Sequence, residues 1–468
     1  MSPVIHWFRQ DLRLADNLAL HAAAGQGALI PVFILDDETP GKWKPGAASR
    51  WWLHKSLEAL EASLAKRGSR LILRRGNAHK IIPALLRETG ATAIHWNRQY
   101  EPWAIARDTA LKETLKSQNV KAESFNAALL KEPWQVKTGA DGPFKVFTPF
   151  WRAASATIDE TAPLPAPKKF ASPLEWPRSD TLASWKLLPT KPNWARGFEP
   201  LWAPGEAGAR KRLETFIDRA LAHYAGGRDR PDQQNTSRLS PHLHFGEIGP
   251  RQVWHALQIA RQDRKAGVNV DKFLSEIGWR EFSNHLLYHV PTLPEQNFRP
   301  AFDRFPWERN DRAFKAWTKG QTGYPIVDAG MRELWTTGTM HNRVRMVAAS
   351  FLIKHLLIDW RRGADWFWDT LLDADLANNS ASWQWVAGSG ADAAPYFRIF
   401  NPVLQGEKFD PDGAYVRQWN PELTHCDPRL IHRPWEATNA TSLDYPPPIV
   451  DHGAARAKAL AAFKTIAS

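Results

Sequence analysis

A short segment of the chain carries a carboxylate, an indole and a guanidinium within about one helical turn. Glu276, Trp279 and Arg280 are spaced at i, i+3 and i+4, so a helix would present all three side chains on one face. Such a face could stack on a nucleobase and hydrogen-bond to its edge. An ion pair between Glu276 and Arg280 beside a packed indole is the simpler interpretation, and the spacing alone favours it.

A second group of residues has the chemistry of an anion site. Tyr224 and Arg228 bracket a Gly–Gly pair, and the segment from Thr236 to Ser240 leads into Pro241, which can open a helix. Hydroxyls and backbone N–H groups around a guanidinium at a helix start are typical of phosphate binding. Simple capping of that helix is the alternative, and it is the more frequent use of such residues.

A third group combines an amide with positive charge. Asn342, Arg343 and Arg345 stand where a helical pattern begins, and together they could hold a base edge and anionic groups. His242 and His244 flank one leucine, and for them we expect a role at a helix end rather than metal ligation.

A fourth group contains two near-adjacent carboxylates, Asp373 and Asp375, followed by Trp383-Gln384-Trp385. Carboxylates this close suggest either a metal or a hydrogen-bonding clamp. Because no further carboxylate or histidine lies at a usable spacing, we predict a clamp and no metal.

The first part of the chain predicts the elements that would carry a parallel sheet. Short apolar runs at residues 4–8, 28–35, 71–73 and 93–96 indicate buried strands. Leu53, Leu57, Leu60 and Leu64 fall on one face of a helix between the second and third runs, and Ser49 could cap it. Strand–helix alternation predicts a doubly wound parallel sheet, although no G-x-G-x-x-G motif follows the first strand.

The rest of the chain predicts a connector and then a helical domain. Nine prolines lie between residues 163 and 204, which favours a long segment packed over the surface. Beyond it the pattern is helical, and Pro325 and Gly338 predict the start and end of one helix. We therefore expect an α/β domain over residues 1–130, a linker over 131–200 and an all-α domain over 201–468.

Composition narrows the class of partner. Lys and Arg number 61 against 49 Asp and Glu, a net charge of +12, which suits a polyanion such as nucleic acid or an anionic membrane surface. The single cysteine, Cys426, excludes an internal disulfide and a cysteine-ligated zinc or iron–sulfur site. With no secretory signal and no apolar run of membrane-spanning length, a soluble cytoplasmic protein is expected. The 24 tryptophans exceed ordinary core needs, although packing must still account for most of them.

Six motifs, taken in order, resemble the photolyase and cryptochrome family over almost the whole chain, and most closely its bacterial cyclobutane pyrimidine dimer photolyases. They are W-F-R-Q-D-L-R at 7–13, T-S-R-L-S at 236–240, W-R-E-F at 279–282, T-G-Y-P-I-V-D at 322–328, D-A-D-L at 373–376 and W-Q-W at 383–385. The fold that the resemblance implies is a doubly wound α/β antenna-binding domain followed by an all-α FAD-binding domain.

The resemblance implies which residues hold an FAD in the helical half. The phosphates and ribityl chain would contact Tyr224, Thr236, Ser237, Arg238, Leu239 and Ser240, with a packing contact from Phe273. Arg345 and Asp373 would flank the isoalloxazine, Asp375 would contact its edge and Asn379 would face N5. A guanidinium beside an anionic reduced flavin is physically reasonable, because it stabilises negative charge in a pocket of low dielectric constant.

The implied activity is light-driven repair of cyclobutane pyrimidine dimers in DNA, a lyase reaction with no net redox change. The dimer would flip out of the duplex into a cavity beside the flavin. Trp279 and Trp385 would wall that cavity with Met346 beside them, and Glu276 and Asn342 would hydrogen-bond to the thymine edges. Positive side chains, Arg228 and Arg280 among them, would meet DNA phosphates.

The resemblance also implies an electron-transfer chain and an antenna. Trp383, Trp360 and Trp307 match the chain of tryptophans that re-reduces the flavin, whereas Trp317, Trp335, Trp366 and Trp368 are expected to serve packing. Glu101 matches a position that contacts a folate such as methenyltetrahydrofolate, with a deazaflavin as the second choice of antenna. Trp51 and Trp52 could line that pocket, but a buried helix face explains them equally well.

Three other functions compete with dimer repair. A cryptochrome photoreceptor would share the fold without repair activity, although Asn379 stands where plant-type cryptochromes carry Asp. A (6-4) photoproduct photolyase would need a histidine near Asn342 or, in its bacterial form, an iron–sulfur cluster. A nucleic-acid-binding protein without any cofactor would be colourless. We expect a monomer that acts on DNA and not on a membrane.

Overall fold

A five-stranded parallel sheet forms the first domain of the computed structural model, which describes residues 2–262, 267–393, 397–438 and 443–467. The strands are β1 (Pro3–Phe8), β2 (Ala28–Leu35), β3 (Ile72–Arg75), β4 (Ala93–Asn97) and β5 (Lys121–Phe125), in the order β3-β2-β1-β4-β5. The strand order reverses between β1 and β4, and parallel sheets of this kind bind ligands in the crevice at that point.

Alternating side chains of β1 show why the sheet is covered on both faces. Val4 and Phe8 pack in one cluster with side chains of α1 (Leu18–Gln26) and α2 (Ala47–Ala65). Ile5 and Trp7 pack in another with side chains of α3 (Ala78–Thr89) and α4 (Pro102–Ser117). This arrangement confirms the predicted doubly wound sheet.

Two local predictions in this domain are wrong. Ser49 does not cap α2: the helix begins at Ala47 with Gly46 as its N-cap, and Ser49 is buried with its hydroxyl directed at the Leu371 carbonyl. The edge strand β5 was missed, because its sequence, Lys-Ala-Glu-Ser-Phe, has no continuous apolar run.

The segment over residues 131–200 is less of a linker than its prolines suggest. It contains the helix α5 (Phe147–Ser155), and Phe170, Trp185 and Phe198 fill the core on the α1–α2 side of the sheet. The prolines therefore shape a connector that contributes to a core, and the domain limits at 130 and 200 stay predictions.

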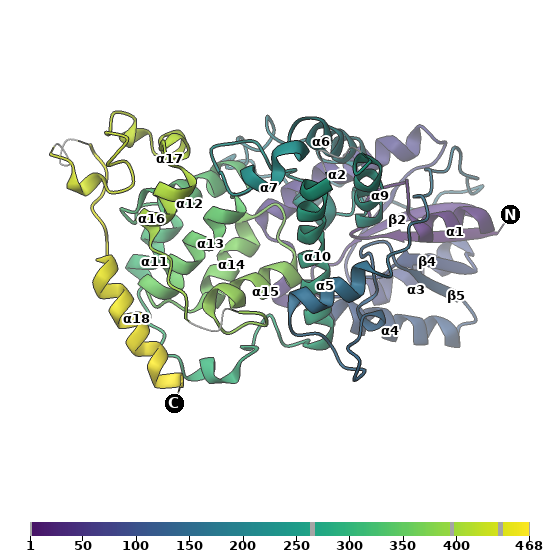
Figure 1. Cartoon of the computed structure of the whole chain (residues 1–468). Coiled ribbons are helices and arrows are strands. Elements are labelled where there is room, and N and C mark those ends of the chain that lie inside the picture. Colours follow the sequence, from purple (N-terminus) through teal and green to yellow (C-terminus); the bar gives the residue numbers. More distant parts are fainter. Residues whose placement is uncertain (1, 263–266, 394–396, 439–442, 468) are drawn as a thin grey trace.

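Helices make up the remainder of the chain, and Figure 1 shows the sheet domain and the helical domain side by side with α18 along the far edge. The helices are α6 (Glu206–Arg219), α7 (Tyr224–Gly227), α8 (Ser240–His244), α9 (Pro250–Ala260), α10 (Gly267–His289), α11 (Asp311–Thr318), α12 (Pro325–Thr337), α13 (Asn342–Ser350), α14 (Trp360–Thr370), α15 (Leu376–Ala387), α16 (Pro402–Phe409), α17 (Ala414–Trp419) and α18 (His452–Ala467). Pro325 and Gly338 begin and end α12 as predicted.

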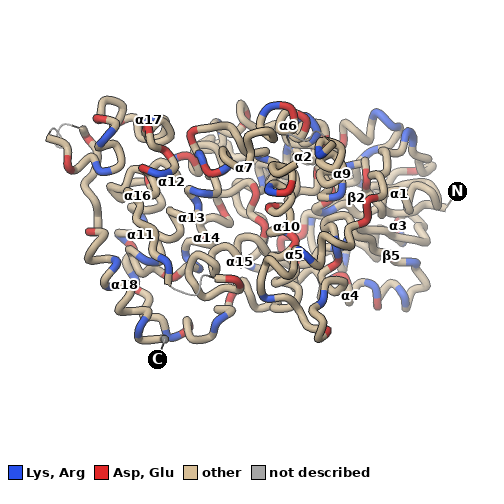
Figure 2. The backbone as a smooth tube through the Cα atoms, viewed as in Figure 1, with Lys and Arg blue, Asp and Glu red and all other residues tan. Residues whose placement is uncertain are grey.

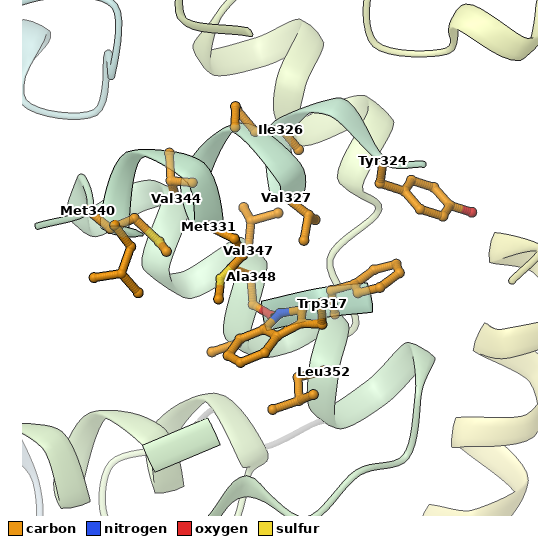
Figure 3. Close-up of a cluster of buried hydrophobic side chains, with 14 of the residues drawn as sticks. Trp317, Tyr324, Ile326, Val327, Met331, Met340, Val344, Val347, Ala348 and Leu352 are labelled. Carbon is orange, nitrogen blue, oxygen red and sulfur yellow. The ribbon is translucent and has the colours of Figure 1, made fainter. Parts of the chain in front are cut away.

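A cluster of buried side chains around Trp317 anchors α11, α12 and α13 (Figure 3). The Trp317 indole N–H donates to the Ala348 carbonyl at 3.0 Å, so this large side chain is packed and also satisfied in its hydrogen bonding. Trp335, also expected to be packing, is instead 54% exposed and stacks on Trp366.

The two domains are joined through Trp52 of α2. Its indole N–H donates to Glu247 at 2.9 Å, and the same carboxylate binds His242 of α8. The Trp52 ring also stacks on Phe245. Trp51 and Trp52 therefore form a buried helix face, and they fix the sheet domain directly behind the segment predicted to bind phosphate.

Lys and Arg are distributed over both domains and not confined to one (Figure 2). No helix in the described ranges combines the length and the apolar character needed to cross a bilayer.

Candidate functional site

Ion pairs join the chemically distinct segments that the sequence singled out. Arg345 of α13 binds both oxygens of Asp373 at 3.0 and 3.1 Å. Burial alone would raise the pKa of Asp373, but the Arg345 charge and a hydrogen bond from Ser240 of α8 outweigh it and lower the pKa below its usual value. A charged carboxylate thus connects α8, α13 and the start of α15.

A second ion pair, made by Glu276, joins α10 to the end of α7. Its carboxylate contacts the Arg228 guanidinium, and Lys272 lies at 3.9 Å. Arg280 takes no part in this pair, which excludes the simple i,i+4 bridge that the spacing favoured. The neighbouring Asp229 pairs with Arg343 at 3.0 Å, so the start of α13 is fixed beside Glu276.

Two more side chains of the same region lie at the start of α13. Asn342 is exposed at the first position of the helix, and Met346 lies half-buried one turn later. Residues four apart share a helix face, so Asn342 and Met346 point in a common direction.

Aromatic faces complete the region. Trp279 is half-buried and stacks on Phe147 of α5, with ring centroids 3.9 Å apart and planes only 8° from parallel. Trp385 is also half-buried, and its indole N–H donates to the Asp392 carbonyl at 3.1 Å.

The segment from Thr236 to Ser240 has the character of an anion cradle. Arg238 adopts a left-handed backbone with φ 51°. Within the described residues no ion pair engages its guanidinium, although Glu333 lies near enough to feel its charge. Ser237 accepts from the Leu239 N–H at 3.3 Å. Phe273 packs edge-on against Tyr224 at 5.2 Å, behind this segment.

Asp375 and Asn379 have structural duties as well as candidate functional ones. Asp375 caps α15 by accepting from the Asn378 N–H at 2.7 Å, and His244 lies 4.0 Å from its carboxylate. The Asn379 amide nitrogen donates to the Ala364 carbonyl at 3.0 Å, which orients the side chain. The amide oxygen takes no part in that bond.

Arg280 and Glu101 lie at the domain junction. Both line a small pocket together with Asp375, and Arg280 donates to the Ala128 carbonyl at 2.7 Å. Burial, with the nearby Asp375 charge, raises the pKa of Glu101. Because Arg228 and Arg280 are engaged inside the protein, their predicted contacts with DNA phosphates would require these bonds to exchange.

A group of three aromatic side chains lies beside that pocket. Trp134 is 39% exposed, and its ring lies 6.3 Å from Tyr100 and 5.5 Å from Tyr288. Tyr100 directly precedes Glu101, so the aromatic group and the pocket are continuous.

The three tryptophans expected to conduct electrons lie in or against one hydrophobic cluster. Trp383 and Trp360 are buried in it, and Trp307 is half-buried at its edge. The Trp360 indole N–H donates to Asn297 at 3.0 Å.

Sequence reasoning missed Phe147, Asp229 and Asp392. Phe147 follows a stretch with no helical periodicity, and Asp392 carries no motif of its own. Only Asp229 had a signal, since it adjoins Arg228 in a segment already singled out.

The fold and this site define a two-domain protein with a helical, cofactor-binding half. A model of the DNA photolyase family matches residues 4–168, and one described as the FAD binding domain of DNA photolyase matches residues 273–465. The chain belongs to the photolyase and cryptochrome family, and its helical half is an FAD-binding domain.

Individual relatives agree with this assignment over the full chain. A deoxyribodipyrimidine photo-lyase of Agrobacterium fabrum is 53% identical over 474 residues, covering 99% of this chain and 98% of the relative. Cryptochrome-1 of Arabidopsis thaliana is 40% identical, covering 97% of this chain and 69% of the relative. The crystal structure of a bacterial class III photolyase from Agrobacterium tumefaciens superposes with a TM-score of 0.96 at 53% identity, covering 100% of this chain and 98% of that one.

Glu281, next to Arg280, fixes α10 to the segment that leaves the sheet domain. Its carboxylate accepts from the Leu130 and Lys131 N–H groups at 2.8 and 3.2 Å. Burial raises its pKa to about 7, against an ordinary value of 4.5.

This raised pKa predicts a pH-dependent stability. The folded protein holds the Glu281 proton more tightly than the unfolded chain, so the contribution is complete below about pH 4.5 and is lost as pH rises through about 7. Glu281→Gln removes the titration. Between these pH values its unfolding free energy, measured with urea, should rise relative to wild type by on the order of 2–3 kcal/mol. A difference that does not change with pH would contradict the assignment.

Proposed function

We propose that the protein uses light to split cyclobutane pyrimidine dimers in DNA, as a lyase that returns two intact pyrimidines. One observation carries the proposal: three ion pairs hold together the segments that we expect to bind the flavin and the lesion. These pairs are Arg228–Glu276, Arg343–Asp229 and Arg345–Asp373. The relatives named deoxyribodipyrimidine photo-lyase support the same activity.

The residues present fit an FAD. Arg238 forms no ion pair among the described residues and stands among hydroxyls and backbone N–H groups, a donor set suited to the diphosphate. Tyr224, Thr236, Ser237, Leu239 and Ser240 complete that cradle, with Phe273 behind it. Arg345, Asp373, Asp375 and Asn379 would hold the isoalloxazine. When bound and reduced, FAD supplies the photoexcited electron donor.

The chain's own residues would receive the flipped-out dimer. Trp279 and Trp385 provide half-buried apolar faces, and Met346 lies half-buried one helical turn after Asn342. Glu276 and Asn342 would hydrogen-bond to the pyrimidine edges and so favour the dimer over stacked, undamaged bases. The net charge of +12 supports attraction to the DNA backbone.

We also propose that Trp383, Trp360 and Trp307 pass electrons from the surface toward the cofactor. Their membership of one cluster, with Trp307 outermost, supports this order. A folate such as methenyltetrahydrofolate, with a deazaflavin second, would serve as antenna near Glu101. Exposed Trp134 beside Tyr100 offers a surface on which such a ring could stack.

The remaining assignments are part of the same proposal. The α/β domain over residues 1–130 would hold the antenna and the domain over 201–468 the FAD. The protein would act as a monomer in the cytoplasm.

Glu276→Ala tests the proposed function directly. Loss of a charge-assisted hydrogen bond at the lesion should lower repair of a cyclobutane dimer about tenfold under blue light while flavin remains bound. Glu214→Ala, which removes an exposed carboxylate from α6, is the matched control and should repair normally.

The assay should include a (6-4) photoproduct and a dark sample. Wild-type protein should restore only the cyclobutane dimer, and only in light. Failure of wild type to repair would favour a cryptochrome function, whereas loss of flavin from Glu276→Ala would show that Glu276 is structural.

Trp307→Phe tests the electron-transfer chain, because phenylalanine is much harder to oxidise than tryptophan. We expect light-driven reduction of the oxidised protein, followed by absorption, to be nearly abolished. Dimer repair by chemically reduced protein should be unchanged. Equal loss of both activities would refute the proposed chain, and Trp335→Phe, at an exposed site, is the control.

A further inference from the structure

The turn after α15 contacts Trp385 of the proposed lesion site directly and Trp279 through Phe147. Asp392 accepts from the Trp385 indole N–H through its main-chain carbonyl at 3.1 Å. Its carboxylate interacts with the backbone N–H of Phe147, which lowers the pKa of Asp392 against the larger raising effect of burial. Phe147 in turn stacks on Trp279 at 3.9 Å. One residue thus links Trp385 on α15 to Trp279 on α10.

We propose that Asp392 is a positioning residue that holds Trp279 and Trp385 at the separation needed to receive a pyrimidine dimer. This inference rests on the proposed function, since it assumes that the two indoles wall the lesion cavity. Asp392 itself touches neither flavin nor lesion in this account.

The Phe147 side of the link lies at the start of a helix. Phe147 is the first residue of α5, and its preceding residue, Val146, provides no side-chain cap. The Asp392 carboxylate therefore faces an N–H that the helix leaves unpaired, at the end where negative charge is favoured. Phe282 backs the stack, with its ring 6.0 Å from Phe147 and 5.9 Å from Trp279.

The Trp385 side is held by the return of the chain. The Gly390 N–H donates to the Gln384 carbonyl at 2.9 Å, and a side chain at Gly390 would collide with the backbone of Gln384 and Trp385. The Arg299 N–H donates to the Ser389 carbonyl at 2.8 Å, which ties the turn to a neighbouring segment.

Asp392 also has an unusual backbone. Its φ is +53°, a left-handed conformation that Asp and Asn tolerate better than most residues. Such strain persists where surrounding contacts determine the conformation, as the contacts with Trp385 and Phe147 do here. Walls held in advance spare the ordering of two large side chains when the lesion enters.

The experiment compares the affinity of the FAD-loaded protein for an oligonucleotide with and without one cyclobutane dimer. Asp392→Ala should weaken binding of the dimer-containing strand about tenfold. It should leave flavin content and affinity for the undamaged strand unchanged. Asp392→Asn keeps a carbonyl acceptor and should bind within about twofold of wild type.

Two further variants keep the test decisive. Phe147→Leu removes the stack on Trp279 and should reproduce the loss without altering the turn. Asp444→Ala is the matched control, because Asp444 also has a positive φ, of +49°, but is exposed and outside the site. It should bind the dimer normally.

The possible results separate this inference from the proposed function. Unchanged dimer affinity in Asp392→Ala, or an equal loss for damaged and undamaged strands, would overturn the positioning role while leaving repair by wild type intact. A wild-type protein with no preference for the dimer would overturn the proposed function, and this inference with it.

Discussion

The ion pair between Arg345 and Asp373 is the interaction on which the arrangement of the site depends. Asp373 has only 6% of its side chain exposed, and an unpaired carboxylate so placed would be costly. The pair holds α13 against the segment that begins α15, and Ser240 brings α8 to the same carboxylate. Without the pair, α13 and α15 would no longer be held in a fixed relative position. The side chains of Asn342 and Met346 on α13 would then not be aligned with those of Asn379 and Trp385 on α15. The guanidinium also leaves a positive charge beside the space in which an anionic reduced flavin would lie.

The sheet domain supports this arrangement from behind. Trp52 contacts Glu247, Glu247 binds His242, and His242 belongs to the short helix that carries Ser240. A side chain from the first domain therefore fixes the cradle in the second, which explains why two chemically different halves form one site. The crevice at the carboxyl ends of β1 and β4 faces the same junction, where Glu101 and Asp375 approach one another.

Regular patterns made much of the fold predictable. Apolar runs gave four of the five strands, and Pro325 and Gly338 marked both ends of α12. The prediction that Ser49 caps α2 was wrong because the helix begins earlier, after Gly46. Strand β5 was not predicted because an edge strand need not be apolar. The segments of the candidate site could also be recognised in the sequence, but which of their charged residues pair with one another could not. Arg228 and Glu276 lie 48 residues apart, and spacing along a helix pointed to Arg280 instead. Asp392 could not be found at all, since no motif marks it and one of its two contacts is made by a main-chain carbonyl, which every residue has.

The most direct test is the affinity of the flavin-free protein for FAD, measured by calorimetry for wild type and for Arg345→Met. We expect one FAD per wild-type chain and binding that is roughly 10- to 100-fold weaker in the variant, because a charge-assisted contact is lost. Equal affinity in the two proteins, or no binding by wild type, would contradict this expectation.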